Sequence, residues 1–289
     1  MKPTAAARYA VIGHPVHHSQ SPFIHAEFAR QTGEPIEYGR LECALDGFAD
    51  AVRSFAAGGA QGCNVTVPFK LQSGALAERV TPRAQLAQAA NLLRFDAGGW
   101  LADNTDGIGL VRDIGVNAGF DLARRTVLLI GAGGAAAGVL GPLIAARPRH
   151  IRVVNRTPDK AHGLVHRHAA WAEQHGVTLQ AGALEDFADG LTGRFDLVLN
   201  CSASSLHGAA VPVSAQLLAP RALAVDLMYG AAAEPFVHWA RTAGAEARDG
   251  LGMLVEQAAE AFFVWRGAMP HTAPVLQALR QRLAPSLPR

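Results

Sequence analysis

Short apolar runs separated by longer amphipathic stretches recur along most of this chain. Runs of β-branched residues and leucine are typical of buried strands, and the longer stretches are typical of helices. We expect strands at Tyr9–Gly13, Ile36–Leu41, Val127–Ile130, Ile151–Val154, Val177–Gln180, Asp196–Leu199 and Ala222–Asp226. We expect helices at Leu45–Ala57, Ile108–Ala118, Gly250–Trp265 and Ala273–Leu283, and one that begins at Pro22 with Ser21 as its N-cap. This alternation predicts an α/β fold with a doubly wound sheet.

The longest uncharged stretch runs from Val127 to Ala146 and contains five glycines. About twenty apolar residues are enough to cross a bilayer as a helix, so a membrane segment is one reading. Gly131, Gly133 and Gly134 follow the first apolar run directly, however, which favours a buried strand that turns sharply into a helix. That is the dinucleotide fingerprint, with small Ala136 at the third small position. Alone the pattern is weak, and a plain tight turn is the other alternative. Pro142 predicts a kink in the helix.

The residues that follow the next apolar run, Ile151–Val154, indicate whether the dinucleotide is NAD or NADP. A site selective for NAD usually has an acidic residue here, which accepts hydrogen bonds from the ribose hydroxyls. The chain instead has Asn155, Arg156 and Thr157, and a guanidinium is a good partner for a 2′-phosphate. NADP is therefore favoured, with an ordinary exposed arginine as the alternative for Arg156 alone.

Further polar side chains gather where expected strands end and helices begin. Ser19 and Ser21 follow the first strand, Lys70 closes the segment 63–70, Asn91 precedes two leucines, and Asp106 ends a polar run from Asp103. Each has a structural alternative when taken singly: the serines as a turn residue and a helix cap, the lysine and Gln257 as solvated side chains. Thr105 is favoured as a helix cap.

Composition narrows the class of protein. The chain has 289 residues, enough for two lobes, and a formal net charge of +2 without a dense basic run, so neither nucleic acid nor a membrane is an expected partner. Its three cysteines, Cys43, Cys63 and Cys201, are widely spaced and predict free thiols in a cytoplasmic protein. His162 and His166 lie one helical turn apart without a third ligand nearby, so we expect no metal.

Taken in order, these motifs resemble shikimate dehydrogenase over nearly the full length. The matching segments are 19–22, 64–70, Asn91, 104–107, 131–135, 155–157, 226–229 and 250–257. The resemblance implies a substrate-binding catalytic domain of residues 1–106, a Rossmann-type NADP domain of residues 107–243, and C-terminal helices, 244–289, that return to the first domain. It implies the reversible, NADP-dependent reduction of 3-dehydroshikimate to shikimate by a monomer or homodimer.

The same resemblance implies residue roles by position. Lys70 and Asp106 would be the catalytic pair. The residues implied in substrate binding are Ser19, Ser21, Thr66, Asn91, Asp106, Tyr229 and Gln257. Those implied in NADP binding are Gly131, Ala132, Gly133, Gly134, Ala135, Asn155, Arg156, Thr157, Leu227 and Gly250.

Three positions depart from the family pattern: Phe69, where histidine or tyrosine is frequent, Leu92, where threonine is frequent, and the run 200–205. They affect expected local contacts and leave the expected reaction intact. Three other functions remain open: a quinate/shikimate dehydrogenase that also takes NAD, a folate-type methylene dehydrogenase, and a protein that binds NADPH as a redox reporter without catalysis. The Ser19 and Ser21 pair argues against the folate-type enzyme.

The residues also suggest a mechanism. Reduction of a ketone by hydride builds negative charge on the carbonyl oxygen, so a positioned proton donor lowers the barrier. We expect Lys70 to act as the acid in reduction and as the base in oxidation, with Asp106 orienting it and binding a substrate hydroxyl.

Overall fold

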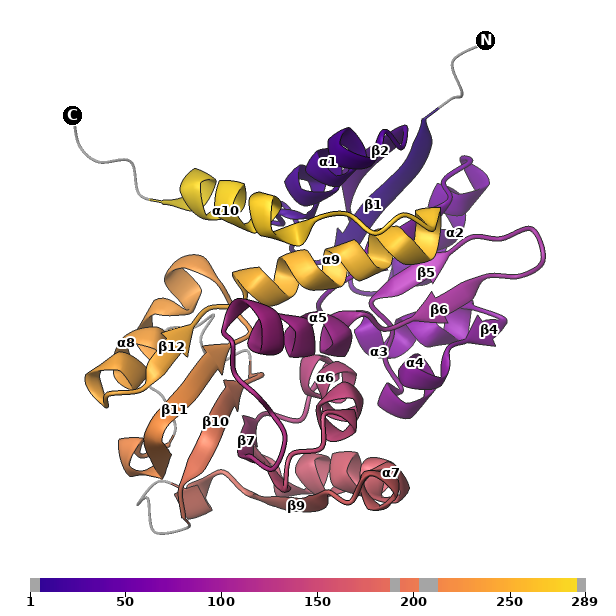
Figure 1. Ribbon diagram of the computed structural model, residues 1–289. Helices are drawn as coiled ribbons and strands as arrows, with labels where there is room; N and C mark the ends of the chain where they lie inside the picture. Colours follow the sequence, from indigo (N-terminus) through magenta and orange to yellow (C-terminus); the bar gives the residue numbers. More distant parts are fainter. Residues whose placement is uncertain (1–5, 188–192, 203–212, 285–289) are drawn as a thin grey trace. The chain divides into compact units, whose positions relative to one another are not determined.

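The computed structural model describes residues 6–187, 193–202 and 213–284. The chain forms two compact units, one made of residues 1–109 with 254–289 and the other of residues 110–253. Each unit is built around its own six-stranded sheet (Figure 1). Two sheets with parallel strands and many helices confirm the predicted α/β class.

The first unit has a mixed sheet in the order β2-β1-β3-β5-β6-β4. Its strands are β1 (Ala7–Gly13), β2 (Ile36–Glu42), β3 (Gly62–Val65), β4 (Arg79–Val80), β5 (Leu92–Arg94) and β6 (Leu101–Asp103). Strand β1 is parallel to β2 and β3, whereas β5 is antiparallel to β3 and β6. Its helices are α1 (Ser21–Thr32), α2 (Phe48–Ala57), α3 (Lys70–Ser73), η1 (Gly74–Leu76), α4 (Pro82–Ala87) and α10 (Thr272–Leu283). Strand β2 is an edge strand, and α1 and α10 lie side by side.

The second unit has a wholly parallel sheet in the order β12-β11-β10-β7-β8-β9, the strand order of a classical dinucleotide-binding domain. Its strands are β7 (Thr126–Ile130), β8 (His150–Asn155), β9 (Thr178–Ala183), β10 (Phe195–Asn200), β11 (Leu218–Asp226) and β12 (Glu246–Arg248). Its helices include α6 (Gly134–Ala145), α7 (Pro158–His175), α8 (Glu234–Thr242), η3 (Glu185–Phe187), η5 (Ala215–Leu217) and η6 (Gly230–Ala232).

Two helices contain the points where the chain passes from one unit to the other. Helix α5 (Asp106–Arg112), followed by the π-helical turn η2 (Asp113–Asn117), contains the first point, and α9 (Leu251–Arg266) contains the second. Because β12 pairs with β11, residues 246–248 belong to the second unit and the return begins within α9. The functional roles of the two predicted domains stay a prediction.

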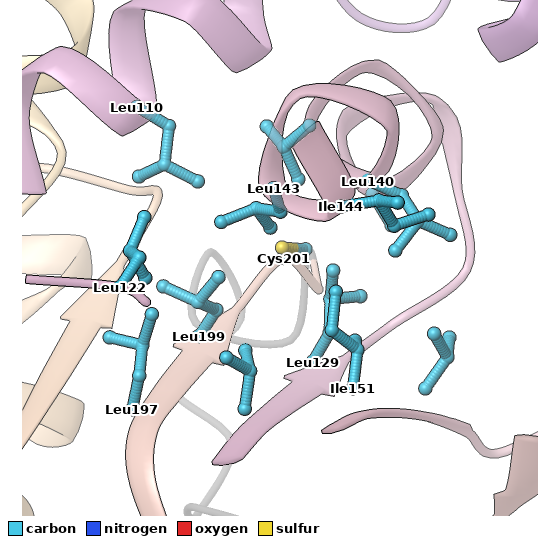
Figure 2. Close-up of a cluster of buried hydrophobic side chains, with 14 of the residues drawn as sticks. Leu110, Leu122, Leu129, Leu140, Leu143, Ile144, Ile151, Leu197, Leu199 and Cys201 are labelled. Atoms are coloured by element: carbon cyan, nitrogen blue, oxygen red, sulfur yellow. The ribbon is translucent and has the colours of Figure 1, made fainter. Parts of the chain in front are cut away.

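Aliphatic side chains fill the space between α6 and the strands of the second unit. Leu140, Leu143 and Ile144 of α6 lie over Leu129 of β7 and Leu199 of β10, and all five are fully buried (Figure 2). The central strands β7 and β10 are almost wholly buried, and their middle residues, 127–130 and 197–199, are all apolar, as expected where helices cover both faces of a parallel sheet. Helix α6 starts on this core, so packing fixes where its N-terminus lies.

Three expectations about helix ends were wrong. Ser21 is the first residue of α1 rather than its N-cap, because helical hydrogen bonding already begins at the Gln20 carbonyl, which accepts the N–H of Ile24 at 3.1 Å. Helix α2 begins at Phe48 and leaves Leu45 exposed. Helix α5 begins at Asp106, two residues earlier than expected, and becomes π-helical at Asp113.

The uncharged stretch 127–146 is the strand, turn and helix β7–α6. Helix α6 continues through Pro142 and ends three residues later, so few hydrogen bonds follow the proline; the expected kink stays a prediction. Among the described residues, none of the helices combines the length and the apolar character that crossing a bilayer requires.

Candidate functional site

A cluster of polar side chains in the first unit draws on four separate segments. Lys70 is the first residue of α3, Asn91 precedes β5, Thr105 and Asp106 begin α5, and Gln257 lies on α9. Asn91, Thr105, Asp106 and Gln257 are buried, and Lys70 is nearly so. The sequence predicted four of these five as site residues, and the fold brings all five together.

Lys70 and Asp106 form the charged centre of this cluster. Lys70 Nζ lies 2.6 Å from Asp106 Oδ2, and the two side chains are 16% and 5% exposed. The ion pair is therefore largely removed from water, where removing one partner would leave a buried charge unpaired. The solvated alternative for Lys70 is wrong.

The amide of Asn91 holds the second oxygen of the same carboxylate. Asn91 Nδ2 donates to Asp106 Oδ1 at 2.9 Å and also lies 3.1 Å from Gln257 Oε1. The amide orientation follows from its other end, because Asn91 Oδ1 accepts the backbone N–H of Thr105 at 2.8 Å. Both oxygens of Asp106 therefore have donors, and the carboxylate plane is fixed.

Backbone contacts explain why these segments meet. The N–H of Ala90 donates to the Lys70 carbonyl at 2.8 Å, and the N–H of Asn91 donates to the Asp103 carbonyl at 3.0 Å. Asn104 Oδ1 accepts the N–H of Asp106 at 3.1 Å, which orients the start of α5.

One glycine permits the close approach of α5 and α9. A Cβ at Gly109 would lie 2.6 Å from the Cβ of Gln257, so a side chain here would push α9 away. Gln257 is 8% exposed, its Nε2 donates to the Leu254 carbonyl at 2.9 Å, and its Oε1 therefore faces Asn91. The surface alternative for Gln257 is wrong.

The two serines form a second polar feature of the first unit. Ser19 Oγ donates to Ser21 Oγ at 3.2 Å and accepts the N–H of Ser21 at 3.3 Å, and both residues are buried. Their hydroxyls are thus neighbours at the start of α1. If the Ser19 proton turns away from Ser21, the two hydroxyls can donate two hydrogen bonds to one anion.

Two more residues are predicted to bind the substrate, Thr66 and Tyr229. Thr66 follows β3, is half-buried and donates its N–H to the Ile12 carbonyl at 2.9 Å. Tyr229 follows β11 in the second unit and is half-buried. Their contacts with a substrate stay predictions.

The glycine turn of the second unit has the backbone that a dinucleotide site needs. Gly131 has φ +110°, and a Cβ there would lie 3.1 Å from the backbone of Cys201 and Ser202, so this position requires glycine. Among the described residues, a Cβ at Gly133 would meet no atom within 4 Å, so the position beside this backbone is open. Helix α6 starts at Gly134, and its first N–H groups lack helical partners.

The ends of the neighbouring strands complete this surface. Arg156 and Thr157 after β8 are exposed, and Asn155 Nδ2 donates to the Thr157 carbonyl at 2.9 Å. After β11, a Cβ at Gly250 would collide with the Leu227 carbonyl, so these two backbones lie in direct contact. The residues present therefore fit an NADP site: a glycine turn with an open position at Gly133, a helix N-terminus and an exposed guanidinium.

Part of the run 200–205 lies outside the described residues, namely 203–205. Within the described part, Asn200 Nδ2 donates to Asp226 Oδ2 at 2.9 Å, and Asp226 Oδ1 accepts the N–H of Met228 at 2.8 Å. This buried pair holds together the ends of β10 and β11, the edge where such sheets bind ligands.

Over residues 6–187, 193–202 and 213–284, no three His, Cys, Asp or Glu side chains gather as a metal site. His162 and His166 lie on α7.

Sequence reasoning missed several residues that support the site. Thr105 is fully buried, and its hydroxyl lies 3.2 Å from Asn91 Oδ1 and 3.3 Å from Gln257 Oε1, so it belongs to the cluster. Arg40 of β2 donates to the Ser19 carbonyl, and Tyr38 of the same strand donates to Asn64 of β3. Because they are two residues apart on a strand, the sequence could have placed both on one face of β2. It could not have shown their partners, which lie 21 residues away for Arg40 and 26 for Tyr38.

A buried histidine lies just behind the serines. His25 of α1 stacks on Tyr38 with ring centroids 4.1 Å apart, and Phe28, Phe262 and Trp265 complete the aromatic cluster around it. Burial lowers the pKa of His25 to about 3, from an ordinary value of 6.5. The imidazole is therefore neutral in the folded protein at neutral pH.

Comparisons with known families match most of the chain. A model described as the substrate-binding domain of shikimate dehydrogenase matches residues 11–93, and one described as shikimate/quinate 5-dehydrogenase matches residues 115–227. A third, described as the C-terminal domain of shikimate 5′-dehydrogenase, matches residues 250–280.

Individual relatives cover almost the whole length. The chain is 62% identical over 282 residues to a protein of Methylibium petroleiphilum named shikimate dehydrogenase (NADP(+)), covering 96% of this chain and 95% of the relative. A crystal structure of an Ael1 enzyme from Pseudomonas putida is 43% identical, with a TM-score of 0.84 and coverage of 98% and 100%. The Thermus thermophilus shikimate 5-dehydrogenase in complex with NADP(H) and shikimate is 29% identical, with a TM-score of 0.78 and coverage of 96% and 100%.

The buried histidine generates a prediction for stability. Because the pKa of His25 is about 3 in the folded chain and 6.5 when exposed, the unfolded chain takes up this proton first as the pH falls. The contribution of neutral His25 to the free energy of unfolding is therefore fully present above pH 6.5, and it is lost progressively as the pH falls from 6.5 to 3. By linkage, the loss at pH 5 is about 2 kcal/mol.

Urea unfolding of the native chain and of His25→Gln at pH 7.5 and pH 5 measures this. The variant should be less stable at pH 7.5, yet lose about 2 kcal/mol less than the native chain on going to pH 5. The exposed His271→Gln, in the same unit, is the matched control and should keep the native pH slope. An equal slope in His25→Gln and the native chain would contradict the assignment.

Proposed function

Because this chain belongs to the shikimate dehydrogenase family, we propose that it catalyses the NADP-dependent, reversible reduction of 3-dehydroshikimate to shikimate. The observation that carries this is the buried Lys70–Asp106 pair, 2.6 Å apart, with Asn91 and Gln257 around it. Relatives that cover nearly the whole chain are named NADP-dependent shikimate dehydrogenases, which supports both the reaction and the cofactor.

Lys70 is the proton donor in this mechanism. When bound, NADPH supplies the hydride to the carbonyl carbon, and the carbonyl oxygen gains negative charge. Lys70 Nζ donates a proton to that oxygen and forms the hydroxyl; in the oxidation of shikimate the neutral amine takes the proton back. Asp106 holds Nζ in one place through a short ion pair, so the donor does not need to be ordered during the reaction.

Asp106 and its neighbours bind the ring hydroxyls. The carboxylate can accept from a substrate hydroxyl as well as from Lys70, because each of its oxygens has two lone pairs. Asn91, Gln257 and Thr66 supply further polar groups for the ring. A ring that lacks a matching hydroxyl leaves these buried groups unpaired, which is a strong source of specificity.

The hydroxyls of Ser19 and Ser21 bind the substrate carboxylate, together with Tyr229. Hydrogen bonds from neutral hydroxyls to an anion are charge-assisted and directional, so they select both charge and shape. The two serine oxygens lie 3.2 Å apart, which is close enough to serve one carboxylate.

The second unit holds the dinucleotide. Residues 131–135 approach the pyrophosphate, with Gly131 and Gly133 leaving room and the N-terminus of α6 offering N–H donors. Arg156, with Asn155 and Thr157, binds the 2′-phosphate of NADP. Leu227 and Gly250, whose backbones touch, line the other side of the site.

Enzyme assays distinguish this function from two alternatives. A quinate/shikimate dehydrogenase would oxidise quinate, and would accept NAD if Arg156 did not discriminate. A redox reporter would bind NADPH without turnover, and it leaves the buried Lys70–Asp106 pair without a purpose. We further propose a cytoplasmic monomer or homodimer; the three free thiols, Cys43, Cys63 and Cys201, support a reducing compartment.

The test of the function is direct. Purified protein with shikimate and NADP should form reduced nicotinamide, followed by absorbance, with kcat/KM at least tenfold higher than with quinate or with NAD. Binding of NADPH without any turnover would contradict the proposal and favour the redox reporter.

Replacement of the proton donor tests the mechanism. Lys70→Ala should lower kcat about a hundredfold or more, because acid–base catalysis is lost, while the affinity for NADPH measured by fluorescence stays within twofold. Arg53→Ala, which removes an exposed cation from α2 in the same unit, is the matched control and should keep the native kcat. Undiminished turnover in Lys70→Ala would remove Lys70 from the reaction.

Replacement of the guanidinium after β8 tests cofactor selection. Arg156→Gln should raise KM for NADP about tenfold or more and leave KM for NAD nearly unchanged, because only NADP carries the 2′-phosphate. Arg167→Gln, exposed on α7, controls for the loss of a positive charge from this unit. A parallel rise in both KM values would show that Arg156 does not read the phosphate.

A further inference from the structure

Strand β2 places an arginine against the backbone of the serine pair. Arg40 Nη2 donates to the Ser19 carbonyl oxygen at 2.6 Å, and Arg40 Nε donates to the same oxygen at 3.1 Å. Two donors of one planar guanidinium thus converge on one acceptor. Hydrogen bonds from an ionised donor are stronger than neutral ones, so this contact fixes the Ser19 peptide group.

The Ser19 carbonyl lies within a short turn whose other groups are also held. The N–H of Ser19 donates to the Val16 carbonyl at 3.1 Å, and Ser19 Oγ joins the hydroxyl and the N–H of Ser21. Arg40, from strand β2, holds the carbonyl oxygen of this turn. The position of Ser19 Oγ therefore depends on the orientation of a peptide unit that Arg40 binds.

The register of β2 explains why Arg40 reaches this turn. Side chains two residues apart on a strand lie on the same face, so Tyr38 and Arg40 share one face of β2. Tyr38 donates its hydroxyl to Asn64 Oδ1 at 2.7 Å, and Asn64 Nδ2 donates to the Asn91 carbonyl at 3.1 Å. The same strand face thus contacts both the serine turn and, through Asn64, the segment that carries Asn91.

Charge gives Arg40 a second effect. The serine hydroxyls are neutral, so they do not offset the charge of a bound carboxylate. A guanidinium on the carbonyl of Ser19 brings a full positive charge next to the turn that carries them. Arg40 is exposed, so solvent screens part of its charge, and the remaining attraction favours an anion at this turn. The ring of His18, beside Arg40, has its pKa lowered by burial and by the positive charges of His17 and Arg40, so it contributes less charge of its own.

We propose that Arg40 is a positioning residue for carboxylate recognition: it holds the Ser19 peptide so that the Ser19 and Ser21 hydroxyls point together, and its charge favours an anionic substrate there. This inference rests on the proposed function, because it assumes that the serine pair binds the substrate carboxylate. Arg40 touches neither the reacting carbonyl nor Lys70 in this scheme, so its effect belongs to substrate binding rather than to the chemical step.

Kinetics of Arg40→Met and Arg40→Lys test the inference. Arg40→Met keeps the aliphatic length without donors, and should raise KM for shikimate about tenfold, with kcat within threefold and KM for NADP unchanged. Arg40→Lys keeps the charge but offers a point donor instead of a fork, and should recover part of the affinity. Arg53→Met, an exposed arginine on α2, is the matched control and should match the native enzyme.

A neutral substrate separates carboxylate recognition from a general structural role. The methyl ester of shikimate lacks the negative charge, so its kcat/KM should be low and differ less than twofold between the native enzyme and Arg40→Met. Circular dichroism and the thermal midpoint of each variant show whether it is folded, and Arg40→Lys serves if Arg40→Met is not.

The outcomes distinguish the two proposals. Native enzyme that does not oxidise shikimate overturns both the function and this inference. Active native enzyme with an unchanged KM in Arg40→Met, or with an equal loss for shikimate and its ester, overturns only the role of Arg40.

Discussion

The buried ion pair of Lys70 and Asp106 is the interaction on which the first unit's polar interior depends. Charges removed from water are tolerated only when each is paired and its remaining hydrogen-bonding capacity is met. Asp106 meets this condition through Lys70 on one oxygen and Asn91 on the other. The amide of Asn91 is oriented in turn by the N–H of Thr105. Four segments must therefore be correctly placed at once, and the ion pair ties the start of α3 to the start of α5.

Close packing makes that placement possible, and the two units achieve it by the same means. Gly109 lets α9 approach α5 so that Gln257 enters the cluster, and Gly131 lets the turn after β7 pass against residues 201 and 202. In both places a single methyl group would collide with backbone or with the base of a side chain. Since cores do not deform continuously, such a collision would move a whole element rather than a loop. The glycines thus determine where the neighbouring polar residues lie, because the missing Cβ lets the backbones approach closely.

Much of the fold could be predicted because its signals are local. The apolar run 127–130 followed by Gly131 and Gly133 specified a strand, a turn and a helix within twenty residues, and the structure has all three. Helix starts were less predictable because a capping side chain marks a start only to within a residue or two: Ser21 has a good capping side chain, yet the carbonyl of Gln20, one residue earlier, already accepts the N–H of Ile24. The resemblance to a family supplied Asn91, Asp106 and Gln257 as site residues, whereas no local pattern says that they share hydrogen bonds across 15 to 166 residues of sequence. Thr105 and Arg40 were missed for that reason, since their partners are distant in the chain.

A site that binds an anion next to its own ion pair has a particular electrostatic problem. A second free cation beside the substrate carboxylate would compete with Lys70 for Asp106, and it would weaken the orientation of the proton donor. Neutral serine hydroxyls avoid that competition because they carry no charge into the pocket. A guanidinium bound to the Ser19 carbonyl then contributes its field from behind the turn, and its donors are already engaged there. Under our proposal, the source of positive charge is thus separate from the groups that bind the substrate. An anion would be favoured, while Asp106 keeps Lys70 and Asn91 as its partners.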